Sequence, residues 1–325
     1  MNDSNESEAI KPASIKVNVD NYVRATTSAQ FEGMLRMSRG MNKFVHAPKP
    51  VALNKQSVER MNRDTIYSSA LVDISSGARL TIPASGDRYL SVIVMNEDYY
   101  TTAIYHDAGV YQLSLEEHDT PFVAIVARIL ADPTDPDDMK IANELQQGLA
   151  IEAIGEGVYT RPNYDADSLA HTHGLLKQLG AGLADASYWN GKKDEVQQTR
   201  HMIGAAFGWG GLPTYEVVYE SVSTPRSLGT YQLNVKDVPV DGFWSISVYN
   251  KAGYFEENAF ESYSINNLTA APNTDGSYTI HFGDCANNLK NCLQIMEGWS
   301  YVVRLYQPHE NVQQGLWHFP KPELI

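Results

Sequence analysis

Apolar and polar positions alternate through two long stretches of this 325-residue chain, and Gly, Pro, Asp or Asn interrupts them at short intervals. A period of two residues is typical of β-strands, because successive side chains point to opposite faces. The first stretch predicts strands at TIYSSALVDI, ARLTIPA, RYLSVIVMN, TTAIYH, GVYQLSL and PFVAIVARIL, and the second at YEVVYESV, TYQLNV, FWSISVYN, SYTIHFG and YVVRLYQP. This spacing favours a β-sandwich or jelly roll over a parallel α/β sheet.

Apolar residues at helical spacing lie before and between the two stretches. Residues 20–39 predict a first helix that Asp20 caps and Gly40 ends, with an apolar face made by Val23, Thr27, Phe31 and Met34. Residues 137–210 carry three more stripes, made by Met139, Ala142, Leu145 and Leu149, by Leu169, Leu176 and Leu179, and by Val196, Ile203 and Phe207.

The predicted fold is therefore mainly β, with two tandem jelly-roll or β-sandwich-like units, an N-terminal helix and a helical segment between the units. We expect a disordered arm over residues 1–19, the first helix and β unit over 20–133, a helical connector over 134–212, and the second β unit over 213–325.

A weak internal repeat supports two β units of similar plan. LTIPASGDRYLSVIVMN resembles LNVKDVPVDGFWSISVYN, and VARILADP resembles VVRLYQP further along. Order and pattern agree at both places, which is the signature of a repeated structural unit. The correspondence pairs Ser91 with Ser245, Val94 with Val248, Asn96 with Asn250, and Arg128 with Arg304.

The net charge of −14 argues against partners that require a basic surface. Nucleic-acid grooves need clustered Lys and Arg, and no run of these residues exceeds two here. No apolar run approaches the ~18–20 residues of a membrane-spanning helix. The start, MNDSNESEAIKPAS, lacks the basic and apolar regions of a signal peptide. We therefore expect no nucleic-acid partner and no membrane span.

Two cysteines, Cys285 and Cys292, bracket an Asn-rich loop in FGDCANNLKNCLQI. A disulfide that closes this loop is the preferred interpretation, and two free thiols are the alternative. A metal site is disfavoured because only His281 lies nearby. A disulfide would indicate an oxidising compartment.

Several phrases resemble one bacterial family, namely MNRDTIYSS, MNEDYY, RHMIGAAFGWGG, VKDVPVDGFWSISVYN, GYFEENAFESYSINN and GWSYVVRLYQP. Its members join two domains of unknown function, DUF1254, which resembles roughly residues 40–130, and DUF1214, which resembles roughly residues 215–320. The resemblance implies two jelly-roll-like units with accessory helices and no particular activity. Many members carry a secretion signal, which this sequence lacks. The cysteine loop matches the family and favours a periplasmic or secreted location, with the cytoplasm as the alternative.

Arg63 and Asp64 lie where a turn runs into the first long strand. An Arg at such a junction can bind a carboxylate or phosphate through its planar fork. Asp64 could orient it or act as a base, and Tyr67 could point toward the same opening as a proton donor. The alternative is an Arg–Asp ion pair that holds the loop.

The segment MNEDYY places acids and phenols at the end of another strand. Paired carboxylates suit glycoside hydrolysis or cation binding, but adjacent strand residues face opposite ways, so Glu97 and Asp98 need a turn to share a substrate. Glu97 is the candidate acid/base here, and Asn96 and Tyr99 are candidate ligand contacts. A solvated turn is the alternative.

The segment TRHMIGAAFGWGGLP predicts a helix end followed by a glycine-rich turn. The apolar stripe places Arg200 near the packed face and His201 well away from it. A buried Arg needs acidic or carbonyl partners, so Arg200 is a candidate ligand contact or a link from helix to sheet, with Asp64, Glu97 or Asp98 as its expected partners. Trp209 is a candidate stacking surface for a ligand.

The strand GFWSISVYN has one core face and one face of hydroxyls and aromatic rings. Such a face suits a carbohydrate or small aromatic ligand, and Trp244 and Asn250 are the candidate contacts. Two buried faces are the alternative. A serine-hydrolase role for Ser245 is disfavoured because no G-x-S-x-G context surrounds it.

No cofactor or metal is predicted. His171 and His173 are two residues apart on an expected helix and so face different sides. The chain has no HExxH, GxGxxG or GxxxxGK[ST] motif.

Two functional hypotheses remain open. The first is a protein that binds a small molecule or carbohydrate-like ligand between the two β units, or that serves in assembly, with a homo-oligomer as a plausible state. The alternative is a hydrolase or lyase that acts on a small anionic or neutral substrate through Arg, carboxylate and Tyr side chains. A raised pKa at Asp64 or Glu97 would favour the enzyme.

Overall fold

The computed structural model describes residues 13–325 of the chain, apart from residues 57, 184 and 223–226. The first β unit consists of two antiparallel sheets, a larger one of strand order β1-β2-β7-β4-β5 and a smaller one of order β6-β3-β8. Val72, Leu80 and Val94 belong to the buried core between them. The strands are β1 (Val45–Ala47), β2 (Thr65–Asp73), β3 (Ala78–Ile82), β4 (Leu90–Asn96), β5 (Thr101–Tyr105), β6 (Gly109–Leu113), β7 (Phe122–Leu130) and β8 (Ala150–Ala153).

The second β unit also pairs two sheets, of order β12-β11-β15-β9 and β14-β13-β10-β16. Its core lies between the sheets and includes Ile246, Phe282 and Trp299. The strands are β9 (Val217–Val222), β10 (Tyr231–Val235), β11 (Trp244–Tyr249), β12 (Ser264–Asn266), β13 (Tyr278–Gly283), β14 (Cys292–Gln294), β15 (Ser300–Tyr306) and β16 (Glu323–Leu324).

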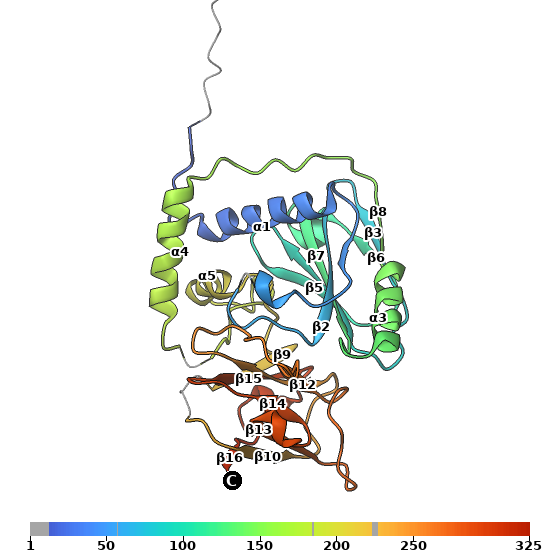
Figure 1. Ribbon diagram of the computed structural model, residues 1–325. Coiled ribbons are helices and arrows are strands. Elements are labelled where there is room, and N and C mark those ends of the chain that lie inside the picture. The colour runs from blue at the N-terminus through green and yellow to red at the C-terminus, as the bar shows by residue number, and fades with distance from the viewer. Residues whose placement is uncertain (1–12, 57, 184, 223–226) are drawn as a thin grey trace, which may run out of the picture.

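Helices cover one face of the larger sheet in the first unit (Figure 1). Helix α1 packs on β2 and contacts α4 and α5. Phe31 of α1 shares a core with Leu71 of β2 and Ile93 of β4. The apolar face of α1 therefore packs against one apolar face of the strands. The helices are α1 (Tyr22–Ser38), α2 (Leu115–His118), α3 (Pro136–Gly148), α4 (Ala166–Gly180), α5 (Gln198–Phe207) and α6 (Glu310–Gln313), with 3-10 turns η1 (Leu53–Lys55) and η2 (Cys285–Asn287).

The structure confirms the mainly β fold, the N-terminal helix and every strand expected from the alternating pattern. The strands that the pattern missed are β1, β8, β12, β14 and β16, which have only two to four residues and cannot show a clear alternation. One of them, β8, lies inside the expected helical connector and extends the smaller sheet of the first unit. The jelly-roll topology stays a prediction.

The start of the chain differs from expectation where it is described. Residues 1–12 of the expected arm lie outside the described residues, but Ile15 forms a β-bridge with Tyr164 and Val17 is buried. These apolar groups tie residues 13–19 to the helical layer, so they are not a free arm. The expected cap Asp20 is also wrong, because the N-cap of α1 is Asn21, without a side-chain hydrogen bond. Arg39, in the left-handed conformation, ends the helix in place of Gly40.

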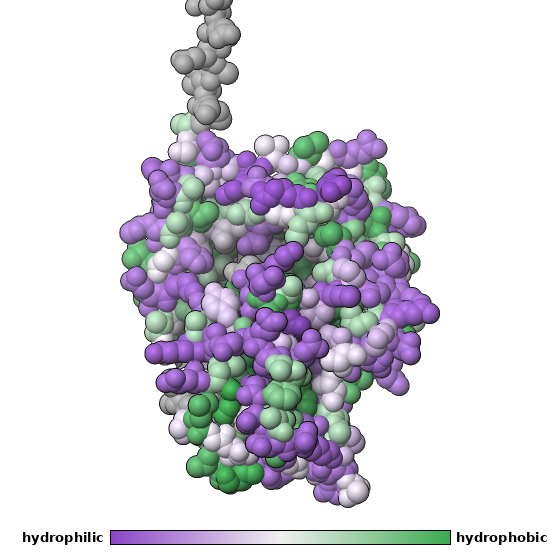
Figure 2. Space-filling view, in the orientation of Figure 1, coloured by the Kyte–Doolittle hydropathy of each residue, from purple (hydrophilic) through white to green (hydrophobic). Residues whose placement is uncertain are grey.

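The disulfide between Cys285 and Cys292 is formed, as the sequence predicts. No helix in the described part of the chain has the length and apolar character to cross a membrane. Among the described residues, no group of three or more His, Cys, Asp or Glu side chains is arranged to hold a metal ion. The face of the molecule in Figure 2 is largely hydrophilic, and apolar groups gather at its lower end, over the second β unit.

The second β unit lies below the first in Figure 1, with the sheet that contains β9 and β15 nearest to it. The outer face of this sheet, of order β12-β11-β15-β9, packs against the first unit, because Val217 and Tyr306 share a core with Tyr89 and Leu130. Tyr89 and Phe243 lie edge to face there, with ring centroids 5.0 Å apart. The amide of Asn266 donates to the carboxyl of Asp64 over 3.2 Å. This interface is therefore both aromatic and polar.

Candidate ligand-binding site

Each β unit contributes a cross-strand row of Tyr, Arg and Ser to the interface. In the first row, Tyr67 of β2 and Ser91 of β4 both lie opposite Arg128 of β7. In the second row, Tyr219 of β9 and Ser245 of β11 both lie opposite Arg304 of β15. The repeat in the sequence pairs the two arginines and the two serines, and the observed register agrees with that pairing.

The two rows come together at the interface. Asn62, just before β2, donates from one side-chain amide to the hydroxyl of Tyr67 at 3.1 Å and to the hydroxyl of Tyr306 at 3.2 Å. Tyr67 therefore lies beside a residue of β15. Tyr89 of the first unit packs on Tyr306 with ring centroids 5.3 Å apart. Phenols from both units thus surround the space between the arginines.

Arg304 has hydrogen-bond partners that suit a structural role. It is 3% exposed. Its guanidinium donates to the hydroxyls of Ser247 and Tyr249, at 2.9 and 2.8 Å, and to the carbonyl oxygen of Arg60 at 2.8 Å. Burial raises the pKa of the nearby Asp64, and the charge of Arg304 opposes this rise. Arg304 thus ties the segment before β2 to the second β unit.

Arg128 occupies the equivalent place in the first unit but lacks such partners. It is 7% exposed, and one guanidinium nitrogen, Nη1, has no hydrogen-bond partner. The other, Nη2, donates to the carbonyl oxygen of Gly210. Among the described residues no carboxylate forms an ion pair with it, and the groups that raise its pKa, against desolvation, are the phenols of Tyr67, Tyr219, Tyr89 and Tyr306. We call Arg128 and these four phenols the Arg128 site.

The four phenols differ in their acidity. Desolvation raises the pKa of Tyr89, Tyr219 and Tyr306. Desolvation also acts to raise the pKa of Tyr67, but the charge of Arg128 and hydrogen bonds with Thr65, Asn62 and Arg128 outweigh it, so that pKa is lowered. At neutral pH three phenols are therefore firm proton donors, while Tyr67 is the one that most readily ionises.

Solvent reaches the Arg128 site. Tyr219 is 41% exposed, although desolvation is the largest cause that raises the pKa of its phenol. Tyr67 and Asn62 are half-buried. The outer edge of the site is therefore open to solvent, whereas Nη1 of Arg128 itself is buried.

Arg63 and Asp64 do not form the expected ion pair. Arg63 points outward, donates to the carbonyl oxygen of Val51 at 2.7 Å and stacks over the ring of Tyr263. Asp64 points inward and is 1% exposed, with one carboxyl oxygen unpartnered. Burial raises the pKa of Asp64, although Arg304, Ser245 and Asn266 each lower it. The alternation along β2 separates the two side chains, and only Asp64 reaches the interface.

The segment Asn96–Tyr100 holds the first unit to the helical layer. Glu97 and Asp98 pair with Arg24 of α1 at 2.8 and 2.7 Å, so the turn presents both acids to one partner. Burial raises the pKa of Glu97 even though Arg24 lowers it. The side-chain oxygen of Asn96 accepts from the backbone N–H of Asp98 and Tyr100, which closes the turn.

Tyr99 and Trp209 support the Arg128 site from behind. The hydroxyl of Tyr99 accepts from the backbone N–H groups of Gly210 and Gly211, at 2.9 and 3.1 Å. The second of these belongs to the peptide whose carbonyl oxygen, that of Gly210, accepts from Arg128. Trp209 stacks on Tyr99 and donates to the hydroxyl of Thr27 at 3.1 Å. The indole is thus engaged with the protein rather than presented to a ligand.

The other expected site residues lie elsewhere. Arg200 pairs with Asp185 at 2.9 Å, so its expected convergence on Asp64, Glu97 or Asp98 is wrong. Trp244 is buried in the core of the second unit. The side-chain oxygen of Asn250 accepts from backbone N–H groups of its own turn.

The orientation of α5 also differs from the expected stripe. His201 is 1% exposed and its ring nitrogens contact the carbonyl oxygens of Trp189 and Asp98, whereas Phe207 is 40% exposed. Gly204 explains this packing, because a Cβ there would lie 2.8 Å from Trp189. The helix therefore buries Ile203 of the expected stripe together with His201 and the small residues that follow, and leaves Phe207 partly exposed.

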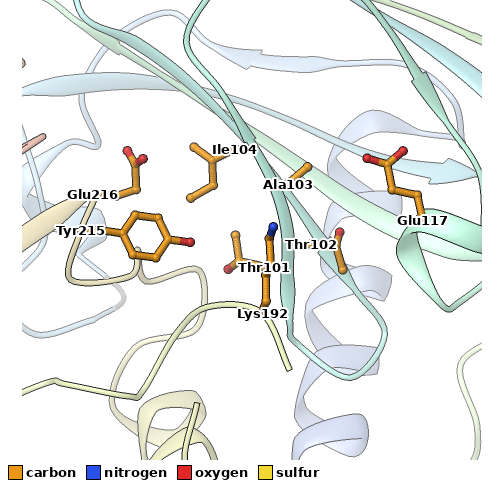
Figure 3. Close-up of a pocket in the computed structure, with 8 residues that line it drawn as sticks. All are labelled: Thr101, Thr102, Ala103, Ile104, Glu117, Lys192, Tyr215 and Glu216. Atoms are coloured by element: carbon orange, nitrogen blue, oxygen red, sulfur yellow. The ribbon is translucent and has the colours of Figure 1, made fainter. Parts of the chain in front are cut away.

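A pocket of about 340 Å³ lies on the outer side of the site, beside the edge strand β5. Figure 3 shows Tyr215 and Glu216 on one side of it, Glu117 on the other, and Thr101 and Lys192 between them. The carboxylate of Glu216 lies 2.9 Å from Nε2 of His106, and the centroid of the His106 ring lies 5.8 Å from that of the Tyr89 ring. Two side chains thus separate this pocket from the phenols around Arg128.

Sequence reasoning singled out Tyr67 but missed the other residues of the Arg128 site. The available signal was the repeat, which pairs Arg128 with Arg304 within two apolar strands. A charged residue inside a strand that is otherwise apolar requires an unusual environment. The phenols of Tyr89, just before β4, of Tyr219 in β9 and of Tyr306 in β15 lie far apart in the chain and carried no local signal.

Comparison with known proteins agrees with this organisation. The family described as "Protein of unknown function (DUF1254)" matches residues 41–112, and "Protein of unknown function (DUF1214)" matches residues 224–310. None of the curated proteins compared matches the chain. The interface draws on both matched regions, because Tyr67 and Ser91 lie in the first and Ser245 and Arg304 in the second.

Two solved structures share the fold. The VPA0106 protein from Vibrio parahaemolyticus has a TM-score of 0.72 at 16% identity, covering 94% of this chain and 97% of that one. An uncharacterised protein from Burkholderia cenocepacia has a TM-score of 0.52 at 14% identity, covering 90% and 85%. These likenesses concern the fold alone. The chain thus carries a region similar to DUF1254 followed by a region similar to DUF1214, in the order that the sequence indicated.

Proposed function

We propose that this protein binds a small anionic molecule between its two β units, with Arg128 as the group that holds the anion. The unpartnered Nη1 of the buried Arg128 carries the proposal. A buried charge without a counter-charge is costly, and an unmade hydrogen bond at the same group adds about 1–3 kcal/mol. A bound anion removes both costs.

The surroundings of Arg128 favour a carboxylate with an apolar or aromatic body. The guanidinium presents a planar donor that suits a carboxylate. Three neighbouring phenols with raised pKa values stay protonated and can donate to the same group. The rings of Tyr89, Phe243 and Tyr306 form an apolar wall beside it. Few polar groups within an aromatic surface are typical of small-molecule sites.

Thermal unfolding with matched ligand pairs tests the proposal. The panel consists of phenylacetate, mandelate, hexanoate and succinate, each compared with its neutral amide. A ligand that binds only the native state stabilises it by about 2.7 kcal/mol at a hundred times its Kd. We expect at least one carboxylate, and not its amide, to raise the melting temperature, Tm.

Variants locate the binding. Arg128→Met should lose the shift, and Arg79→Met, which removes a surface arginine paired with Glu152, should keep it. A panel without any carboxylate-specific shift, or a shift that Arg128→Met retains, would show that Arg128 holds no such anion.

An enzyme is the second candidate, and one observation favours it. The pKa of the buried Asp64 is raised and that of Tyr67 is lowered, so two groups at the same interface are shifted toward neutral pH from opposite sides. Such opposed shifts are typical of acid–base sites. Glu97 has a raised pKa as well, but its ion pair with Arg24 gives it a structural partner.

A further inference from the structure

The hydroxyl of Tyr67 lies among hydrogen-bond donors. The amide of Asn62 donates to it over 3.1 Å, and the guanidinium of Arg128 lies over its ring, 5.5 Å from the ring centroid. Asn62 is itself fixed, because its amide also donates to the hydroxyls of Thr65 and Tyr306. The oxygen of Tyr67 is thus held in place by donors that stabilise a phenolate.

Tyr67 is also placed to reach a ligand on Arg128. The two residues are direct cross-strand neighbours, and such neighbours have Cβ atoms about 4.5–5.5 Å apart. Tyr67 is half-buried, so part of its side chain is accessible to solvent. A carboxylate on Nη1 of Arg128 would therefore hold its adjoining carbon near the hydroxyl of Tyr67.

The second row shows that this arrangement is not imposed by the fold. Tyr219 lies opposite Arg304 as Tyr67 lies opposite Arg128. Arg304 nevertheless directs its guanidinium to Ser247, Tyr249 and the Arg60 carbonyl oxygen. The Tyr219 phenol has a raised pKa instead of a lowered one. The row of Arg304 therefore has a structural role. In the row of Arg128, an unpartnered guanidinium nitrogen lies beside a phenol, that of Tyr67, whose pKa is lowered.

We propose that Tyr67 is a catalytic base that removes a proton from the carbon next to a carboxylate held by Arg128. The step rests on the proposed function of Arg128. The C–H bond breaks as an O–H bond forms at the ionised Tyr67, and the C–H electron pair moves into the carboxylate to give an enediolate. Arg128 and the protonated phenols of Tyr89 and Tyr306 stabilise the added charge. The proton returns from Tyr67 to the same carbon, so no other reactant is consumed.

The substrate class follows from this chemistry. The carbon next to the carboxylate must carry hydrogen, and a neighbouring ring or electron-withdrawing substituent must acidify it. Arylacetates and 2-hydroxy arylacetates meet both conditions, and their rings match the aromatic wall of Tyr89, Phe243 and Tyr306.

Deuterium exchange tests the proposal directly. Each carboxylate of the panel that raises Tm is incubated with the protein in D2O, and proton NMR follows loss of the signal at the carbon next to the carboxylate. We expect exchange with phenylacetate or mandelate. A positioned acid or base contributes about 10²–10⁴-fold, so Tyr67→Phe should slow exchange at least 100-fold while keeping the Tm shift.

The outcomes separate the two proposals. Arg128→Met should lose both exchange and the Tm shift. A Tm shift without exchange, or equal exchange in wild type and Tyr67→Phe, would refute the catalytic role and leave binding intact, whereas the absence of any Tm shift would refute both. The rate in wild type should rise with pH until Tyr67 is ionised and then level off, which a merely structural Tyr67 would not produce.

Discussion

Replacing the two equivalent arginines should change stability in opposite directions. Arg128→Met and Arg304→Met remove the same charge from the same position of two similar sheets and substitute a flexible apolar side chain. If Arg128 is held in the protein without a counter-charge, its loss removes a penalty. If Arg304 is a structural link, its loss leaves several groups without partners.

The magnitudes follow from the contacts of each side chain. Arg128 is 7% exposed, has an unpartnered Nη1 and contacts one carbonyl oxygen, that of Gly210. Replacing even a buried ion pair by apolar groups of similar volume is neutral or stabilises by about 1–4 kcal/mol, and removing a charge without a counter-charge should do no worse. Against this, the Gly210 carbonyl loses about 1 kcal/mol of hydrogen bonding. We therefore expect Arg128→Met to raise the free energy of unfolding by about 1–2 kcal/mol.

Arg304→Met should have the reverse effect. It leaves the hydroxyl of Tyr249 and the carbonyl oxygen of Arg60 without their donor, and Asp64 without a nearby cation. Breaking such a buried charged network costs about 3–5 kcal/mol. The two variants should thus differ by about 4–7 kcal/mol.

Urea denaturation followed by circular dichroism measures both values, because the free energy of unfolding falls linearly with denaturant. The assay is run without added carboxylate on protein dialysed into Tris chloride. If Arg128→Met lowers the free energy of unfolding as much as Arg304→Met does, the protein itself balances the charge of Arg128. The proposal that an anion binds there would then lose its basis.

Three further results are expected. A titration followed by the absorbance of ionised tyrosine should show one phenol with a pKa below the usual value near 10. This step should vanish in Tyr67→Phe and move to higher pH in Arg128→Met, because the charge of Arg128 lowers the pKa of Tyr67. An unchanged titration curve in Tyr67→Phe would contradict the assignment to Tyr67. Glu216 raises the pKa of His106 above its unfolded value, although desolvation lowers it. The His106–Glu216 pair should therefore stabilise the fold fully below about pH 6.5 and lose this effect as pH rises through the pKa of His106 in the folded protein. The free energy of unfolding of wild type should exceed that of His106→Gln by an amount that shrinks between pH 5.5 and 9. A difference that grows with pH would refute the pairing. Reduction of the Cys285–Cys292 disulfide, whose cysteines are 7 residues apart, should cost about 2.5 kcal/mol by loop entropy, and an unchanged Tm with dithiothreitol would contradict it.

The sequence predicted the architecture well because period-two alternation marks each long strand of the two sandwiches. It failed where the pattern is short or where packing overrides it. The strand β8 has four residues and no alternation of its own. In α5 the apolar stripe placed Ile203 correctly in the core, but Phe207 is 40% exposed and His201, expected away from the packed face, is buried.

The candidate site was only partly predictable for a similar reason. Tyr67 and Asp64 stood out because polar residues at the start of an apolar strand are conspicuous in a linear pattern. The phenols of Tyr89, Tyr219 and Tyr306 join Arg128 only through the contact between two units separated by the helical connector. Burial in that contact raises the pKa of all three phenols. Arg63 and Arg200 were conspicuous in sequence, but short-range geometry directs them to Val51 and Asp185.

A crystal structure with the carboxylate that gives the largest Tm shift would show where the anion binds. We expect its carboxylate oxygens within hydrogen-bond distance, about 2.7–3.2 Å, of Nη1 of Arg128, with its body against the rings of Tyr89 and Tyr306. A carboxylate bound instead in the surface pocket lined by Arg63 and Tyr263, with Arg128 unoccupied, would contradict it.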